Sequence, residues 1–265
     1  MNKIYRSFRF WLSARNSIGF IGFYKYFYSP AKGSLSWFLN QYSKDLAGDF
    51  TVIQIGANDG INNDPIHKFI KRDKWKGVLL EPQKDIFEKS LQKLYQRNKE
   101  IVTVNAALGE SDGIAFLYKI AFCNSRWATG LASFDKQVLL EAFSSGYVKR
   151  KADEVNIPIP PNPEDQITAE EVMLICPETL MKKYRIEKID LLQIDTEGFD
   201  YEVIKLFNIK KTQPVVIIYE NIHLSETDRA ACLQLLRDNG YSVVLKGANT
   251  LAMQNPPEKY RMFFN

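Results

Sequence analysis

Cysteine is scarce in this chain, and its spacing excludes the sites that depend on neighbouring thiols. Only Cys123, Cys176 and Cys232 occur in 265 residues, and no two of them form a C-x-x-C pair. Zinc ribbons and disulfide frameworks need such clusters. We therefore expect three reduced thiols and a cytoplasmic chain.

A long apolar run is also missing. The most apolar stretch near the N-terminus, residues 17–28, is too short to cross a bilayer and contains Lys25. Arg15 interrupts the apolar region that a signal peptide would need, and no clean cleavage site follows. A membrane-spanning helix is therefore not expected, although a peripheral membrane contact stays open.

Acidic residues are absent from positions 1–44, which carry seven of the 35 Lys and Arg residues. The remaining 28 basic and 31 acidic residues give the rest of the chain a net charge of −3, so the basic character belongs to this arm. A nucleic-acid substrate would need a basic surface beside the site, so we expect no nucleic-acid partner. Because ten aromatic residues also lie within positions 5–28, two readings stay open. Either residues 1–48 cap the domain or form a homodimer contact, or they lie on an anionic membrane surface.

The motifs that bind a pyrophosphate are lacking too. A β-branched apolar run at 52–55 predicts a buried parallel strand, and the loop Gly56-Ala57-Asn58-Asp59-Gly60 follows it. Glycines let such a loop turn sharply and approach a ligand closely. The third glycine of G-x-G-x-x-G is missing, and no Gly-Lys-Ser/Thr follows. This pattern favours a nucleoside ligand without a phosphate chain, and S-adenosylmethionine fits.

Polar or small residues follow three further predicted strands at the points where those strands end. Glu81 ends the strand at 77–80 and can accept hydrogen bonds from both ribose hydroxyls. Asn105, Ala106 and Ala107 follow the strand at 101–104, where small residues leave room for an adenine ring that Asn105 could bond. The strand at 189–194 ends in Asp195-Thr196-Glu197-Gly198. Since the carboxyl ends of parallel strands share one edge of a sheet, we expect one ligand site there.

The order of elements predicts an α/β domain with a doubly wound, mostly parallel sheet. We expect an N-terminal helical arm over residues 1–48, with a helix at 34–47, and a catalytic domain over 49–265. Further strands are expected at 214–219, 241–246 and 249–253, and helices at 64–72, 83–96, 177–184, 199–206 and 225–239. Residues 112–188 form an insertion between the third and fourth strands, with an extra strand at 112–119 and a helix at 135–146. Its proline-rich stretch at 157–165 is either a surface loop or a substrate lid.

Four segments together resemble the FkbM family of S-adenosylmethionine-dependent methyltransferases. They are I-G-A-N-D-G at 55–60, L-L-E-P at 79–82, N-A-A-L-G at 105–109 and I-D-L-L-Q-I-D-T-E-G at 189–198, and the last is the most specific. The resemblance covers about residues 51–252 and implies a class I, Rossmann-like fold. Gln54 stands where many methyltransferases carry an acid, and Asp59 is the candidate to replace that charge. The residues predicted to bind the cofactor are Gln54, Gly56, Ala57, Asn58, Asp59, Gly60, Glu81, Pro82, Asn105, Ala106, Ala107 and Asp195.

The predicted reaction is O-methylation of a hydroxyl on a sugar, a glycan or a related metabolite, as the resemblance implies. A hydroxyl is a weak nucleophile, so a proton acceptor is needed beside it. The candidates are Asp195, Glu197, Glu220 and His223, all at strand ends. Asp195 and Glu197 could instead cap the following helix, or bind Mg²⁺ together with Glu220. The sequence does not decide between a metal and a plain general base, and we do not expect a divalent cation.

Two other functions stay open. An NAD-dependent sugar-modifying enzyme would use the same kind of sheet, but it should carry G-x-G-x-x-G or a Tyr-x-x-x-Lys pair at a matching place, and neither is present. A non-catalytic nucleotide-binding scaffold would be expected to lose Glu81, Asp195 and Glu197, which all remain. An active methyltransferase is therefore the prediction.

Overall fold

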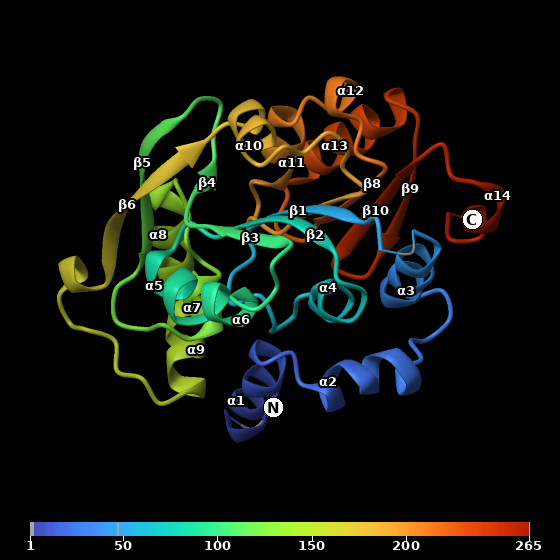
Figure 1. Cartoon of the computed structure of the whole chain (residues 1–265). Helices are drawn as coiled ribbons and strands as arrows, with labels where there is room; N and C mark the ends of the chain where they lie inside the picture. The colour runs from blue at the N-terminus through green and yellow to red at the C-terminus, as the bar shows by residue number, and fades with distance from the viewer. Residues whose placement is uncertain (1–2, 47, 265) are drawn as a thin grey trace.

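The protein is built around a large, mostly parallel sheet. The computed structural model describes residues 3–46 and 48–264, and Figure 1 shows its α/β arrangement. Within these residues seven strands form the main sheet in the order β3-β2-β1-β7-β8-β10-β9. All neighbours from β3 to β8 pair in parallel, and β10 runs antiparallel to β8 and β9. The strands are β1 (Thr51–Ile55), β2 (Lys76–Leu80), β3 (Ile101–Val104), β7 (Leu191–Ile194), β8 (Val216–Glu220), β9 (Tyr241–Lys246) and β10 (Asn249–Gln254). The predicted fold class is confirmed.

The central strands are apolar because both faces of the sheet are covered. Along β1, Val52 packs into one core cluster, while Ile53 and Ile55 pack into the cluster on the other face. All five residues of this strand are buried, as expected for a parallel strand between two layers of helices. At the start of β7, Asp190 accepts a hydrogen bond from the backbone N–H of Thr51 at 2.9 Å. That bond fixes the register between β1 and β7, whose ends form the site.

Two groups of helices cover the sheet. Figure 1 shows α10, α11 and α13 above it and α3, α4 and α6 below it. The upper group is α10 (Pro177–Lys183), α11 (Asp200–Leu206), α12 (Ile209–Thr212) and α13 (Glu226–Asp238). The lower group consists of α3 (Leu35–Asp45), α4 (His67–Asp73), α5 (Lys84–Ile86), η2 (Phe87–Leu91) and α6 (Gln92–Tyr95). A further short helix, α14 (Glu258–Arg261), lies near the C-terminus. Phe50 and Trp75 stack at 3.8 Å inside the lower layer, so aromatic packing supports that face.

One helix begins later than expected. The pattern predicts a helix from Asp64 with Pro65 in its first turn, but α4 begins at His67. The carboxylate of Asp64 accepts hydrogen bonds from the backbone N–H groups of Ile66 and His67 at 2.7 and 2.8 Å. Asp64 therefore satisfies the free donors at the start of the helix from outside it.

The insertion between β3 and β7 forms a second, smaller sheet beside the first. Its order is β4-β6-β5, where β5 (Gly113–Ile120) is the extra strand that was predicted. The strands β4 (Ala107–Leu108) and β6 (Ile167–Ile175) complete it, with α7 (Arg126–Thr129), α8 (Lys136–Ser144), α9 (Tyr147–Glu154) and the short η3 (Pro163–Asp165). A separate core around Ile120, Leu139 and Val148 holds this unit together. Figure 1 shows the small sheet at the left edge, next to the ends of β1, β2 and β3.

The N-terminal arm is helical and packs on the lower layer of helices. It consists of α1 (Lys3–Ala14), α2 (Ile18–Gly22) and the π-helical turn η1 (Phe23–Phe27). None of the helices within the described residues is long and apolar enough to span a membrane. The helix α3 contributes buried residues to the main core. A domain boundary near residue 48 stays a prediction.

Candidate active site

A cavity of about 630 Å³ opens at the carboxyl ends of β1, β2 and β7, a size usual for small-molecule sites. The loops after these strands form one wall, and the segment 126–141 of the insertion forms another. Residues predicted from the sequence that line it are Gly56, Asn58, Glu81, Pro82, Ala106, Ala107, Asp195, Glu197 and His223. Residues from four predicted strand ends therefore meet around one space.

Gly56 lets two strand ends approach each other closely. Its φ of +79° is a conformation that side chains disfavour, and a Cβ built on it would lie 1.9 Å from the carbonyl oxygen of Asp195. The backbone N–H groups of Gly56 and Ala57 both bond the carbonyl of Leu80, at 3.1 and 2.8 Å. The glycine loop is thus tied to β2 on one side and pressed against the end of β7 on the other.

Glu81 lies at the wall of the cavity and is almost fully buried, at 2% exposure. Its two carboxylate oxygens accept hydrogen bonds from the backbone N–H groups of Asn58 at 2.8 Å and Gln83 at 2.9 Å. Burial raises the pKa of Glu81 to about 7, against the opposing effect of these two bonds. The carboxylate therefore orders the glycine loop and still faces the space where a ribose is expected.

Five of the predicted cofactor residues do not line the cavity. Gln54 is buried and donates to the carboxylate of Asp64 at 3.0 Å. Asp59 accepts bonds from the backbone N–H groups of Ile61 and Asn62, so its carboxylate shapes its own loop. Asn105 donates to the carbonyl oxygens of Glu81 and Pro82, both at 2.9 Å, and so holds the end of β2. The remaining two of the five are Ala57 and Gly60. For these five, a direct role in binding stays a prediction.

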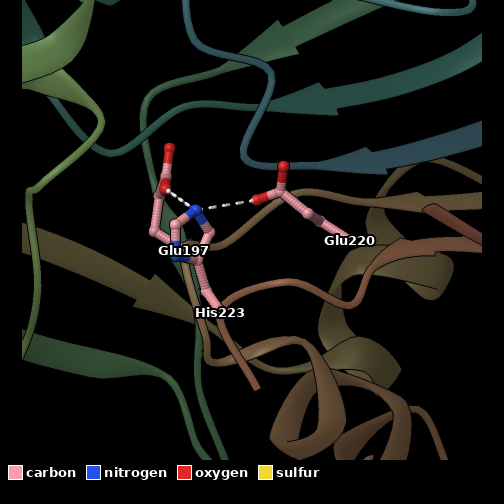
Figure 2. Close-up of side chains that lie close together, drawn as sticks. All are labelled: Glu197, Glu220 and His223. Carbon is pink, nitrogen blue, oxygen red and sulfur yellow. Dashed lines mark ion pairs between the residues drawn. The ribbon is translucent and has the colours of Figure 1, made fainter. Parts of the chain in front are cut away.

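His223 lines the cavity, and Figure 2 shows it between the carboxylates of Glu197 and Glu220. Its Nε2 is 3.3 Å from an oxygen of Glu197 and 3.6 Å from an oxygen of Glu220. The imidazole side chain is 47% exposed, whereas the carboxylates are 29% and 19% exposed. The histidine is therefore within ion-pair distance of both carboxylates, and a substrate can reach it.

The acidic groups around this histidine lack enough positive partners. Burial, and then Asp195 and Glu220, raise the pKa of Glu197 to about 8. Burial and Asp195 raise the pKa of Glu220 to about 7. Burial also raises the pKa of Asp195, although Arg126 opposes the rise from 3.6 Å away. A positive charge bound nearby, such as the sulfonium or ammonium group of a ligand, would stabilise the ionised forms of these carboxylates.

Glu197 has an unusual backbone conformation for its type, with a φ of +52°. For a residue other than glycine this region costs roughly 1–2 kcal/mol, and such residues concentrate at functional sites. Gly130 of the insertion makes room for the side chain, since a Cβ there would lie 2.8 Å from Oε1 of Glu197. Two separate parts of the chain therefore set the position of this carboxylate.

Two residues of the site were not predicted. Arg126, at the start of α7, lines the cavity and pairs with Asp195. Asp200 is fully buried and accepts bonds from Thr196 and from the backbone N–H of Glu220 at 3.1 Å. Asp200 thus joins the end of β7 to the end of β8. An acid two residues after D-T-E-G was a visible signal for Asp200, whereas nothing in the pattern around Arg126 marked it.

The same three residues of Figure 2 are a group that could hold a divalent cation. One ligand atom from each of Glu197, Glu220 and His223 lies within 4.8 Å of the others. This differs from the cation-binding alternative considered from the sequence, in which Asp195 joined the two glutamates. The geometry fits either a proton-transfer group or a cation site. Activity in the presence of a chelator distinguishes these two roles.

Comparison with known proteins identifies the family. The sequence model described as "Methyltransferase FkbM domain" matches residues 54–243. This chain belongs to the FkbM methyltransferase family. The predicted family is confirmed, and residues 54–243 form a methyltransferase domain of the S-adenosylmethionine-dependent class. No curated protein matches the sequence.

Several solved structures resemble the FkbM chain distantly. A methyltransferase FkbM from Methylobacillus flagellatus KT is 12% identical at a TM-score of 0.47, over 78% of this chain and 44% of that one. This chain therefore spans less than half the length of that relative. A precorrin-6y C5,15-methyltransferase from Geobacter metallireducens GS-15 is 10% identical, with a TM-score of 0.39 over 86% and 94% of the two chains. A Podospora anserina methyltransferase, PaMTH1, bound to SAH is 10% identical, with a TM-score of 0.40 over 90% and 87%. The family assignment does not depend on these three.

The residues around the cavity fit the cofactor of this class. S-adenosylmethionine carries a sulfonium and an ammonium group, and the site offers the under-compensated carboxylates Asp195 and Glu197. Its ribose needs hydrogen-bond acceptors, and Glu81 supplies a buried carboxylate. The close approach at Gly56 leaves no room for a side chain between the strand ends. The hydrogen-bond acceptors, the negative charge and the space are therefore of the kind that the cofactor requires.

Proposed function

We propose that the protein transfers the methyl group of S-adenosylmethionine to a hydroxyl of a sugar, a glycan or a related hydroxylated metabolite. One observation carries this proposal: His223 lies between Glu197 and Glu220 and lines a cavity whose wall also contains the glycine loop and Glu81. A cofactor site and a proton acceptor are thereby joined in one space.

The inner part of the cavity is proposed to bind the cofactor, which supplies an electrophilic methyl group when bound. Glu81 accepts hydrogen bonds from the ribose, while the small residues Ala106 and Ala107 leave space for the adenine. Asp195 and Glu197 stabilise the positive charge electrostatically. Much of the rate of a methyl transfer comes from holding nucleophile and methyl group in line, and the walls of the cavity serve this.

The outer part is proposed to activate the acceptor. Nε2 of the half-exposed His223 side chain would take the proton of the hydroxyl while the hydroxyl oxygen bonds to the methyl carbon. The bond between that carbon and the sulfonium sulfur breaks at the same time, which leaves the cofactor product as a neutral thioether. Glu197 and Glu220 stabilise the imidazolium that results, since both lie within 4 Å of that nitrogen. General-base catalysis of this kind contributes about 10²–10⁴-fold in rate.

A hydroxyl acceptor is favoured over a more nucleophilic group because a hydroxyl needs a base to take its proton, and the site contains such a base in His223. Of the two alternatives considered from the sequence, family membership speaks against an NAD-dependent sugar enzyme. The retained carboxylates and the placement of His223 speak against a scaffold that only binds a nucleotide.

The test combines binding and transfer. Titration calorimetry with S-adenosylmethionine and, separately, with NAD checks the cofactor, and binding of NAD alone would overturn the proposal. Transfer of labelled methyl from the cofactor to a cell-envelope extract then reports the acceptor. The label should survive mild alkali, because methyl ethers resist hydrolysis and methyl esters do not. Label released as methanol, or label found on amines, would rule out methylation of a hydroxyl.

A further inference from the structure

The N-terminal arm exposes an unusual number of large apolar side chains on its outer side. Phe8, Trp11, Ile18, Phe23, Tyr26 and Phe27 are between 47% and 91% exposed. Single exposed apolar residues are common, but a continuous group of them marks an interaction surface. We call these six residues the arm surface.

The arm is nevertheless fixed to the domain through its opposite side. Ser13 and Ala14 of α1 are buried, and the hydroxyl of Ser13 is 2.7 Å from Nε2 of the buried His67. Arg9 donates to the carbonyl of Ile61 at 3.0 Å, and Phe20 packs edge-on against His67. In a helix of 3.6 residues per turn, Phe8 and Trp11 lie nearly opposite Ser13. The arm surface therefore points outward because the other face is already packed.

Figure 1 shows α1 and α2 along the lower edge of the molecule, with α4 and α6 between them and the sheet. The outward aromatic rings have positively charged neighbours. The guanidinium of Arg15 lies 4.3 Å over the ring of Trp11, and the ammonium of Lys25 lies 5.4 Å from the ring of Tyr26. Arg6 and Lys32 are exposed as well, and positions 1–44 contain no acid.

This combination points to one kind of occupant. Aromatic and apolar residues that alternate with Lys and Arg on a helix lying flat suit the interface of a bilayer that carries negative charge. A second copy of the chain suits it less well, because a symmetric contact through the arm would bring the same basic residues together from both copies. The charge of the arm therefore decides between a lipid surface and a dimer.

We propose that the arm surface docks the protein on an anionic membrane, with Phe8, Trp11, Phe23 and Phe27 entering the headgroup region and Arg15 and Lys25 facing lipid phosphates. The inference goes beyond the proposed methyl transfer and is independent of it.

The test measures sedimentation of the full-length protein with phosphatidylcholine vesicles, with and without phosphatidylglycerol. We expect binding to the anionic vesicles at low salt, and weaker binding as salt is added. The double variant W11S/F27S should bind at least about tenfold more weakly, because it removes two large apolar contacts. The double variant R15Q/K25Q should lose about fivefold for each charge removed.

The matched control is I114S/F116S on β5, which removes two apolar side chains that are each 58% exposed but lie outside the arm. It should bind vesicles as the wild type does. Circular dichroism of each variant checks that the fold is kept. The proposal is overturned if the wild type ignores anionic vesicles at low salt, or if W11S/F27S and the control bind equally well. A wild-type dimer that W11S/F27S converts to a monomer, without vesicle binding, would assign the arm surface to a second copy instead.

Discussion

Replacement of Gly56 by alanine tests the close approach on which the site depends. A Cβ at this position would lie 1.9 Å from the carbonyl oxygen and 2.9 Å from the carbonyl carbon of Asp195, in a backbone with a φ of +79°. These atoms belong to the backbone, so relief requires the ends of β1 and β7 to separate. That movement would strain the bond between the N–H of Asp195 and the carbonyl of Ile55, which is 3.0 Å long.

The cost has two parts that can be separated. The positive φ contributes roughly 1–2 kcal/mol for any side chain, and the steric overlap contributes about 1–3 kcal/mol more. Gly247→Ala is the matched control, because Gly247 also has a positive φ, of +68°, but its Cβ would meet nothing within 4 Å. We therefore expect Gly56→Ala to lower the free energy of unfolding by about 2–5 kcal/mol, and Gly247→Ala by only about 1–2 kcal/mol.

Equilibrium unfolding in urea gives both values, and calorimetry with S-adenosylmethionine gives the effect on binding. Gly56→Ala should also weaken cofactor affinity, whereas Gly247→Ala should leave it unchanged. If the two variants lose the same stability and bind the cofactor equally well, the ends of β1 and β7 are not in close contact at Gly56. The role inferred for the glycine loop would then be wrong.

Four further outcomes are expected. Glu81→Ala should weaken S-adenosylmethionine binding by roughly 1–3 kcal/mol in calorimetry, because two backbone N–H groups lose their acceptor. The specificity constant kcat/KM should rise with pH up to about 8, where the pKa of Glu197 lies, since Glu197 must be ionised to stabilise the imidazolium of His223, and Glu197→Gln should remove this rise. His223→Ala should lower kcat about 10²–10⁴-fold with cofactor affinity kept. A flat profile between pH 6 and pH 9 in the wild type would exclude that role. Chelator should leave activity intact, whereas loss followed by recovery with added Mg²⁺ would assign the same three residues to a cation. Gly130→Ala should lower kcat more than it lowers the free energy of unfolding, because its φ is ordinary and its Cβ would lie 2.8 Å from the flexible end of the Glu197 side chain and 3.1 Å from the carbonyl oxygen of Arg126.

The sequence was sufficient for the sheet because each of its strands carries its own signal. Apolar runs such as 52–55 and 77–80 can be buried only between two layers, and the polar residues after them mark one edge. The prediction that Asp195, Glu197 and His223 come close together followed from that edge alone. The structure places them around one cavity.

The second sheet was harder to predict because its strands have weak patterns. β4 has only two residues, and β6 carries exposed residues along most of its length because its outer face meets solvent. The helix α9 is mostly charged, and only Val148 and Ala152 are buried, one turn apart. Arg126 was missed for a related reason: its importance comes from a contact with Asp195 across 69 residues of chain, which no local pattern can reveal.

The two walls of the cavity come from different parts of the chain, and this has a consequence for how specificity can change. Residues 55–82 and 195–198 belong to the main sheet and its loops, whereas residues 126–141 belong to the insertion with its own small core. Replacement of the wall formed by residues 126–141 would not alter the strand ends of the main sheet. The glycine loop and Glu81 would therefore stay unchanged. If the proposed function holds, we expect this architecture to separate recognition of the methyl donor from selection of the acceptor, so that new acceptors could be reached through the insertion without rebuilding the half that binds the donor.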